Sequence, residues 1–201
     1  VDMVWTPTPD IVYPQHFQTA VSVNEVSQPL EGASRSGHFQ GVATVVAKLF
    51  NIFQPRYAYF GQKDAQQVVV LKRMVADLNF NLEIVVCPTI REANGLAMSS
   101  RNARIAPELR LHATCLFEAL EVGKTAVFQG IRDAEEIRQR MEAIITATPH
   151  ARLDYVSVAD PTTLVELGTI SDEALLSLAV YLGEVRLIDN IIATVRAGQT
   201  G

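Results

Sequence analysis

Apolar residues in the first part of the chain recur at helical spacing in two segments and form strand-like runs beside them. One helical stripe ends before Pro55 and comprises Val42, Val45, Val46, Leu49, Phe50 and Phe53. A second follows Asp64, a residue type favoured at helix starts, and comprises Val68, Leu71, Val75 and Leu78. A short apolar run at 57–60 and a β-branched run at 82–87 predict strands. The order helix, strand, helix, strand indicates an α/β fold with a parallel sheet.

The residues before the first helical stripe predict two further strands and a loop. Residues 1–5 are largely apolar and are stopped by Pro7 and Pro9, which predicts the tail of a buried strand. Alternation over 19–23 predicts a half-buried strand, and the polar stretch 27–41 predicts an exposed loop. Because the chain starts directly in a predicted strand and without methionine, we expect that a preceding segment is missing.

The second half of the chain has a different pattern. A polar segment over 91–104 leads into a predicted helix that starts near Pro107 and a second helix over 131–145. Three strand-like runs complete the chain, at 153–158, 174–182 and 185–192. Two helices followed by three strands predict a small α+β domain. We place the boundary near Pro88, which divides the chain into residues 1–88 and 89–201.

Composition narrows the set of partners. The 201 residues carry 17 basic and 22 acidic side chains, and a net charge of −5 argues against binding to nucleic acid or to an anionic membrane. No apolar run approaches the roughly 20 residues that span a bilayer. Cys87 and Cys115 belong to no CxxC motif, which fits two reduced thiols. We therefore expect a cytoplasmic protein.

The segment 59–67 joins the end of a predicted strand to the start of a predicted helix, where ligands bind in open parallel sheets. Gly61 lets the backbone approach a ligand, and Lys63 supplies a charge suited to phosphate. Gln67 lies one turn beyond Lys63, so both side chains would face one pocket. On spacing alone, a solvated helix start with an extended lysine is an equal alternative.

Hydroxyl groups lie beside an arginine on a glycine-containing loop before the next predicted helix. Ser99, Ser100 and Arg101 follow Gly95 and Met98 there. Hydroxyls and backbone amides can donate to phosphate oxygens while the guanidinium binds them in a fork, so this loop could hold a polyphosphate. An ordinary polar linker could have the same composition.

A third cluster combines a carboxylate, a guanidinium and an imidazole, which are Glu31, Arg35 and His38. Glycines near both ends of this segment would permit a mobile lid over a site, and a solvated loop is the alternative. The remaining histidines lack a carboxylate or cysteine at ligand spacing, so we predict no metal site in the protein itself.

Together the three clusters resemble the pantothenate synthetases, the pantoate–β-alanine ligases of the nucleotidyltransferase superfamily. The match covers essentially the whole chain and runs through residues 30–42, 60–67, 91–102 and 186–190. The resemblance implies that residues 1–88 are the C-terminal part of a Rossmann-like nucleotide-binding domain with a partial parallel sheet. Residues 89–201 would then be the small α+β C-terminal domain. It also implies a homodimer.

The resemblance further implies a reaction that uses ATP and Mg²⁺. In this family the pantoate carboxylate attacks the α-phosphate of ATP and releases pyrophosphate, and the amine of β-alanine then displaces AMP from the pantoyl adenylate. By position, Gln67 would bind pantoate and the backbone of Ile90 would meet the adenine. The ATP site would comprise Gly61, Gln62, Lys63, Asp64, Ile90, Met98, Ser99, Ser100 and Arg101. Among these, Lys63, Ser99, Ser100 and Arg101 would be the catalytic residues.

The sequence departs from the family pattern in ways that affect the expected activity. Gln62, Ala65 and Asn94 stand where the family usually has Glu, an aromatic residue and often Asp. The His-x-Gly-His motif of the family does not occur in these 201 residues. We therefore expect the isolated chain to lack ligase activity. Two alternatives stay open: a related nucleotidyltransferase with another acceptor, or an inactive fragment that serves as a folding, dimerisation or partial ATP-binding module.

Overall fold

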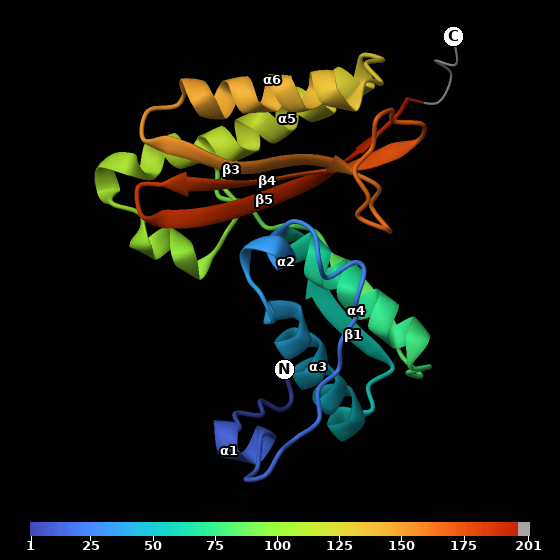
Figure 1. Cartoon of the computed structure of the whole chain (residues 1–201). Helices are drawn as coiled ribbons and strands as arrows, with labels where there is room; N and C mark the ends of the chain where they lie inside the picture. The colour runs from blue at the N-terminus through green and yellow to red at the C-terminus, as the bar shows by residue number, and fades with distance from the viewer. Residues whose placement is uncertain (197–201) are drawn as a thin grey trace. The chain divides into compact units, whose positions relative to one another are not determined.

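The computed structural model describes residues 1–196, and these residues form two compact units (Figure 1). Unit 1 contains Val1–Phe60 and Gln66–Val85, and unit 2 contains Gly61–Ala65 and the chain from Val86 onward. The division at Val86 lies near the predicted boundary at residue 88. Gly61–Ala65, which the sequence-based division assigned to the first domain, packs with unit 2 instead. The last five residues of the predicted domain 89–201 lie outside the described part.

Unit 1 is an α/β unit around a small parallel sheet. Its helices are α1 (Pro9–Val12), α2 (Glu31–Ser34), α3 (His38–Phe53) and α4 (Ala65–Asp77), and its strands are β1 (Tyr57–Gly61) and β2 (Glu83–Cys87). Buried residues of α3 and α4 form the core, with Phe50 edge-on to Phe60 and to Phe80. The predicted order of helix, strand, helix and strand is thereby confirmed.

The segment 27–41 is not the exposed loop that its polarity predicted. α2 lies within it, and α3 begins at His38, four residues before the predicted stripe. The buried side chain of Gln66 organises this segment: its Oε1 accepts from the Glu31 N–H at 2.9 Å, and its Nε2 donates to the carbonyls of Val26 and Pro29 at 3.0 and 2.7 Å. A side chain 35 residues away from Glu31 thus supplies the order that local polarity could not indicate.

The two strands predicted before α3 are also absent from the structure. Residues 1–5 have no regular secondary structure and are largely exposed. Residues 19–23 have no regular secondary structure, and the Val21 N–H donates to the Thr44 hydroxyl of α3 at 2.9 Å. Val21 and Val23 do pack against the core of unit 1, so the alternation identified an inward face but not a strand.

Unit 2 consists of two helices on one face of an antiparallel sheet (Figure 1). The helices are α5 (Cys115–Phe128) and α6 (Ala134–Ala147), and the sheet has the order β3 (Ala151–Ala159), β4 (Glu173–Leu182) and β5 (Val185–Thr194). Buried residues of both helices and of the sheet form one core that includes Leu116, Leu120, Ile137, Met141, Leu176 and Leu178. This arrangement confirms the small α+β architecture expected for the second half of the chain.

The helix predicted to start near Pro107 begins in a different form. Pro107–Thr114 is a 3₁₀ helix, labelled η3, and the α-helix begins only at Cys115. Within η3 only Ala113 is buried, so this segment lacks the continuous buried stripe that stabilises an α-helix.

Gly32 is expected to be essential for the stability of unit 1. A Cβ at this position would lie 1.8 Å from the Ser27 carbonyl oxygen, so Gly32→Ala should lower the free energy of unfolding by about 2 kcal/mol or more. The measurement is urea unfolding followed by the fluorescence of Trp5, the single tryptophan, whose ring lies 5.3 Å from Phe53 in unit 1.

Gly41→Ala is the matched control for Gly32→Ala. Gly41 lies within α3 with open space around its Cα, and alanine is favoured over glycine in a helix by up to about 1 kcal/mol. We expect this variant to be as stable as the parent chain or more so. Equal unfolding midpoints for the two variants would contradict the assignment of Gly32 as a close backbone contact.

Candidate functional site

The junction between β1 and α4 is attached to the C-terminal sheet by one asparagine. A short 3₁₀ turn, η1 (Gln62–Asp64), connects the strand to the helix. The Asn190 Nδ2 on β5 donates to the carbonyls of Gln62 and Lys63 at 3.0 and 2.8 Å, and the Gln62 Nε2 donates to the Asn190 Oδ1 at 3.1 Å. Because Asn190 is buried within the sheet, it holds the backbone of Lys63 against a rigid element.

A buried ion pair holds the loop that follows β2. Asp189 is 3% exposed, and its carboxylate accepts from both terminal nitrogens of Arg91, at 2.6 and 3.1 Å. The same guanidinium donates to the Gly95 carbonyl at 3.0 Å and stacks over the Phe117 ring at 4.6 Å. Gly95 has a φ of +90°, and a Cβ there would lie 2.1 Å from the Phe117 ring. The loop from Arg91 to Gly95 is thus fixed to β5 and α5 together.

The serine-containing loop is shaped by local hydrogen bonds. The Ser99 Oγ accepts a hydrogen bond from the Arg101 N–H at 3.2 Å. It thereby caps the N-terminus of η2, a 3₁₀ helix over Ser100–Arg104. Asn102 is buried, and its Nδ2 donates to the Ala97 carbonyl at 3.0 Å and to Glu92 at 3.3 Å. Its Oδ1 is buried without a hydrogen-bond partner among the described residues.

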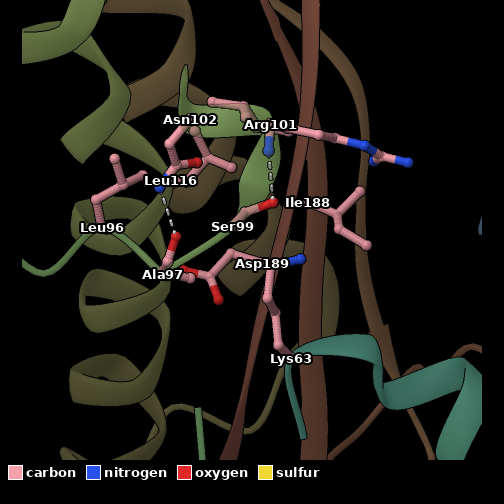
Figure 2. Close-up of a pocket in the computed structure, with 10 residues that line it drawn as sticks. Lys63, Leu96, Ala97, Ser99, Arg101, Asn102, Leu116, Ile188 and Asp189 are labelled. Carbon is pink, nitrogen blue, oxygen red and sulfur yellow. Dashed lines mark hydrogen bonds between the residues drawn. The ribbon is translucent and has the colours of Figure 1, made fainter. Parts of the chain in front are cut away.

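These segments meet at a small pocket in unit 2 (Figure 2). Its polar lining comes from Lys63, Ser99, Arg101, Asn102 and Asp189, and its apolar lining from Leu96, Ala97, Leu116, Leu187 and Ile188. Figure 2 shows the Lys63 side chain extending toward Asp189 and the Arg101 side chain extending past Ile188. The structure therefore brings together the two cationic clusters that the sequence-based division placed in separate domains.

The other predicted ATP-site residues lie near these segments without lining the pocket. Asp64 is half exposed, with its Oδ1 3.7 Å from the Lys63 Nζ. The Ile90 carbonyl accepts from the Met98 N–H at 2.9 Å, and both of these side chains are exposed. Three further predicted residues are exposed or partly exposed around the same turns: Gly61, Gln62 and Ser100.

Gln67 and the third cluster belong to unit 1. Gln67 is half-buried on α4 in unit 1, whereas Lys63 and the pocket that it lines belong to unit 2. The Arg35 guanidinium lies 2.9 Å from the His38 Nε2, and both residues line a polar hollow. Glu31 is buried and is not among the residues that line this hollow.

Sequence reasoning missed the residues that support the site. Arg91, Asp189 and Asn190 were part of the family match but received no individual role. One signal was present, because Asp189 and Asn190 lie between two apolar pairs, 187–188 and 191–192, and such residues are seldom buried without a partner. Their partners, about 100 or more residues earlier in the chain, leave no mark in local spacing.

Other common kinds of site have little support in the described residues. Among residues 1–196 no group of three or more His, Cys, Asp or Glu side chains is placed to hold a metal ion. Both cysteines are free, and burial raises the pKa of the Cys115 thiol to about 11, so this thiol stays protonated at neutral pH. No helix in this part of the chain has the length and apolar character to cross a membrane.

Comparison with known proteins identifies the family to which this chain belongs. The family model described as pantoate-beta-alanine ligase matches residues 1–192. The chain is 54% identical to the pantothenate synthetase of Herpetosiphon aurantiacus, with 95% of this chain and 70% of that protein aligned. It is 51% identical to the enzyme of the same name from Moorella thermoacetica, with 97% and 69% aligned.

The solved structures that resemble this chain come from the same family. The crystal structure of pantothenate synthetase from Thermus thermophilus superposes with a TM-score of 0.92 at 44% identity, covering 95% of this chain and 69% of that one. The Francisella tularensis pantoate-beta-alanine ligase, complexed with beta-gamma ATP and beta-alanine, superposes with a TM-score of 0.67 at 32% identity, covering 92% and 62%. The chain belongs to the pantoate–β-alanine ligase family.

Removing the cation from the buried ion pair should destabilise unit 2 strongly. Arg91→Met leaves the buried Asp189 carboxylate without its partner, which is expected to cost about 3–5 kcal/mol. The double variant Arg91→Met/Asp189→Leu removes both charges and should recover much of that loss. Calorimetric unfolding of the parent chain and both variants measures the difference.

The exposed pair Arg73–Asp77 on α4 provides the comparison for this measurement. Its two side chains are 61% and 45% exposed, so Arg73→Ala should change stability by no more than about 0.5 kcal/mol. If Arg91→Met lowered the free energy of unfolding as little as Arg73→Ala does, the ion pair between Arg91 and Asp189 would not stabilise the site.

Proposed function

We propose that the chain carries the nucleotide site of a pantoate–β-alanine ligase that works through a pantoyl adenylate. The observation that supports this most directly is the shared pocket of Lys63, Ser99 and Arg101 in a chain of this family. Two cationic side chains and a hydroxyl on one pocket suit the oxygens of a polyphosphate. The pantoate carboxylate would attack the α-phosphorus of ATP, with the bond to pyrophosphate breaking. The β-alanine amine would then attack the acyl carbon, lose a proton and release AMP.

Fixed cations favour the first step because negative charge grows on the departing pyrophosphate. Lys63 and Arg101 would stabilise that charge more in the transition state than in bound ATP. Ser99 and Ser100 would donate hydrogen bonds to phosphate oxygens. Lys63 is well suited to this role because its backbone is held by Asn190, so little rearrangement is needed when the ligand binds.

The remaining predicted residues would complete the substrate contacts. The backbone of Ile90 would meet the adenine, Gln67 would bind pantoate, and Met98 to Arg101 would close over the phosphates, with Gly61, Gln62 and Asp64 along the nucleotide. Glu31, Arg35 and His38 would belong to a lid. The hydrogen bond between Arg35 and His38 would keep those two side chains together in that lid.

The proposed reaction uses Mg²⁺, which in such sites keeps several waters and binds mainly to phosphate oxygens. Asp64 is the carboxylate among the proposed ATP-site residues, and its half-exposed position would allow it to contact a hydrated ion. When bound, the ion would neutralise phosphate charge.

We also propose a cellular location, an oligomeric state and an acceptor for the reaction. We place the enzyme in the cytoplasm, on the basis of two free cysteines that form no disulfide, and we propose a homodimer on the basis of the family resemblance. The acceptor would be pantoate rather than another hydroxy acid, because the chain shares its family with pantoate ligases along residues 1–192.

Lys63→Met should weaken ATP binding at least roughly tenfold, because it removes a phosphate-facing charge and keeps a side chain of similar length. Lys72→Met, an exposed position on α4, is the control and should bind ATP as the parent chain does. Isothermal titration with Mg·ATP measures both affinities. Equal losses in the two variants would exclude a specific role for Lys63.

We further propose that a polypeptide of these 201 residues alone is inactive, because it contains no His-x-Gly-His motif to share the phosphate charge. Exchange of labelled pyrophosphate into ATP in the presence of pantoate is the measurement, with a complete family enzyme as the positive control. Exchange at a rate near that of the control would refute this proposal. ATP binding without exchange would identify the polypeptide as a partial nucleotide-binding module.

A further inference from the structure

Two adjacent residues on β5 perform different tasks that the family assignment does not explain. Asp189 binds Arg91 and thereby holds the loop after β2, whereas Asn190 binds the turn that carries Lys63. All the residues in these contacts belong to unit 2. One rigid strand therefore sets the position of both segments that line the pocket.

We propose that Asn190 is a positioning residue for Lys63, which it places in the pocket through the backbone of η1. The inference rests on the proposed nucleotide site and adds the residue that makes its lysine rigid. Asn190 does not contact the ligand in this proposal. It acts only through the Gln62 and Lys63 carbonyls and the Gln62 side chain.

The chemistry of the carboxamide accounts for the choice of asparagine at this position. Both of its N–H groups donate to consecutive carbonyls, and its oxygen accepts from the Gln62 side chain, so three hydrogen bonds converge on one side chain. A carboxylate of the same shape has no N–H, so it would place an oxygen against those carbonyls where asparagine has its amide nitrogen. A serine or alanine could not reach both carbonyls.

The backbone of Asn190 is itself held in place by the sheet and by neighbouring side chains. β5 pairs with β4 over ten consecutive residues, with Asn190 opposite Ser177. The Asn190 N–H donates to the Asp189 carboxylate at 2.8 Å, and its carbonyl accepts from Arg91 at 3.4 Å. The backbone of Asn190 is therefore fixed on both sides before its side chain holds η1. The backbone of Lys63 is therefore fixed as well, although the Lys63 side chain is partly exposed.

The first test is hydrogen–deuterium exchange of the whole chain without ligand. In Asn190→Ala and in the isosteric Asn190→Asp, exchange in peptides over residues 61–67 should accelerate roughly tenfold or more, while peptides from β3 and β4 keep the parent rate. Ser177→Ala is the control on the partner strand, and it should leave the 61–67 peptides unchanged. Unchanged exchange at 61–67 in both Asn190 variants, or an equal rise throughout unit 2, would overturn the proposal.

The second test is a double-mutant cycle on Mg·ATP affinity. Asn190→Ala should weaken binding roughly tenfold in the parent chain but have no further effect in Lys63→Met, because it acts only through that lysine. Independent, additive losses would contradict this role. If the parent chain itself does not bind ATP, the proposed function fails, whereas the exchange measurement still decides whether Asn190 positions the turn.

Discussion

A carboxylate buried as deeply as Asp189 is stable as an anion only beside a cation that also satisfies its hydrogen bonds, and Arg91 supplies both. The rest of the candidate site depends on this pairing. Because Arg91 also binds the Gly95 carbonyl and stacks on Phe117, the ion pair joins a loop, a strand and a helix at one point. The serine-containing loop continues directly from the segment that is fixed in this way.

The site separates groups that hold the structure from groups that are free to meet a ligand. Asp189 and Asn190 are buried and bind other parts of the protein through their side chains, and the buried Asn102 does so through its Nδ2. Lys63 and Arg101 are partly exposed in the pocket lining, where their charges would meet the phosphates of the proposed nucleotide. Because the buried residues fix the loops to the sheet, the side chains that face the pocket keep defined positions even though they lie on loops.

Periodicity in the sequence predicted the helices and strands that bury a continuous apolar face, such as α3, α4 and the β3–β5 sheet. It failed for 19–23, where an apolar face packs inward but the Val21 N–H meets Thr44 instead of a strand. It failed again for 27–41, whose order comes from Gln66. Chemistry and family resemblance pointed to Lys63 and Arg101, and the pocket contains both. Residues that act across about 100 positions, such as Asn190, could not be assigned a partner from spacing.

Because β5 lies at the edge of its sheet, the backbone hydrogen bonds of Asn190 have a second consequence. β5 is an edge strand, and an edge with unsatisfied backbone groups is a template on which another polypeptide can add a strand. At Asn190 both backbone groups are already occupied, the N–H by Asp189 and the carbonyl by Arg91. At this position the side chains that organise the pocket therefore also occupy the backbone groups that an added strand would need.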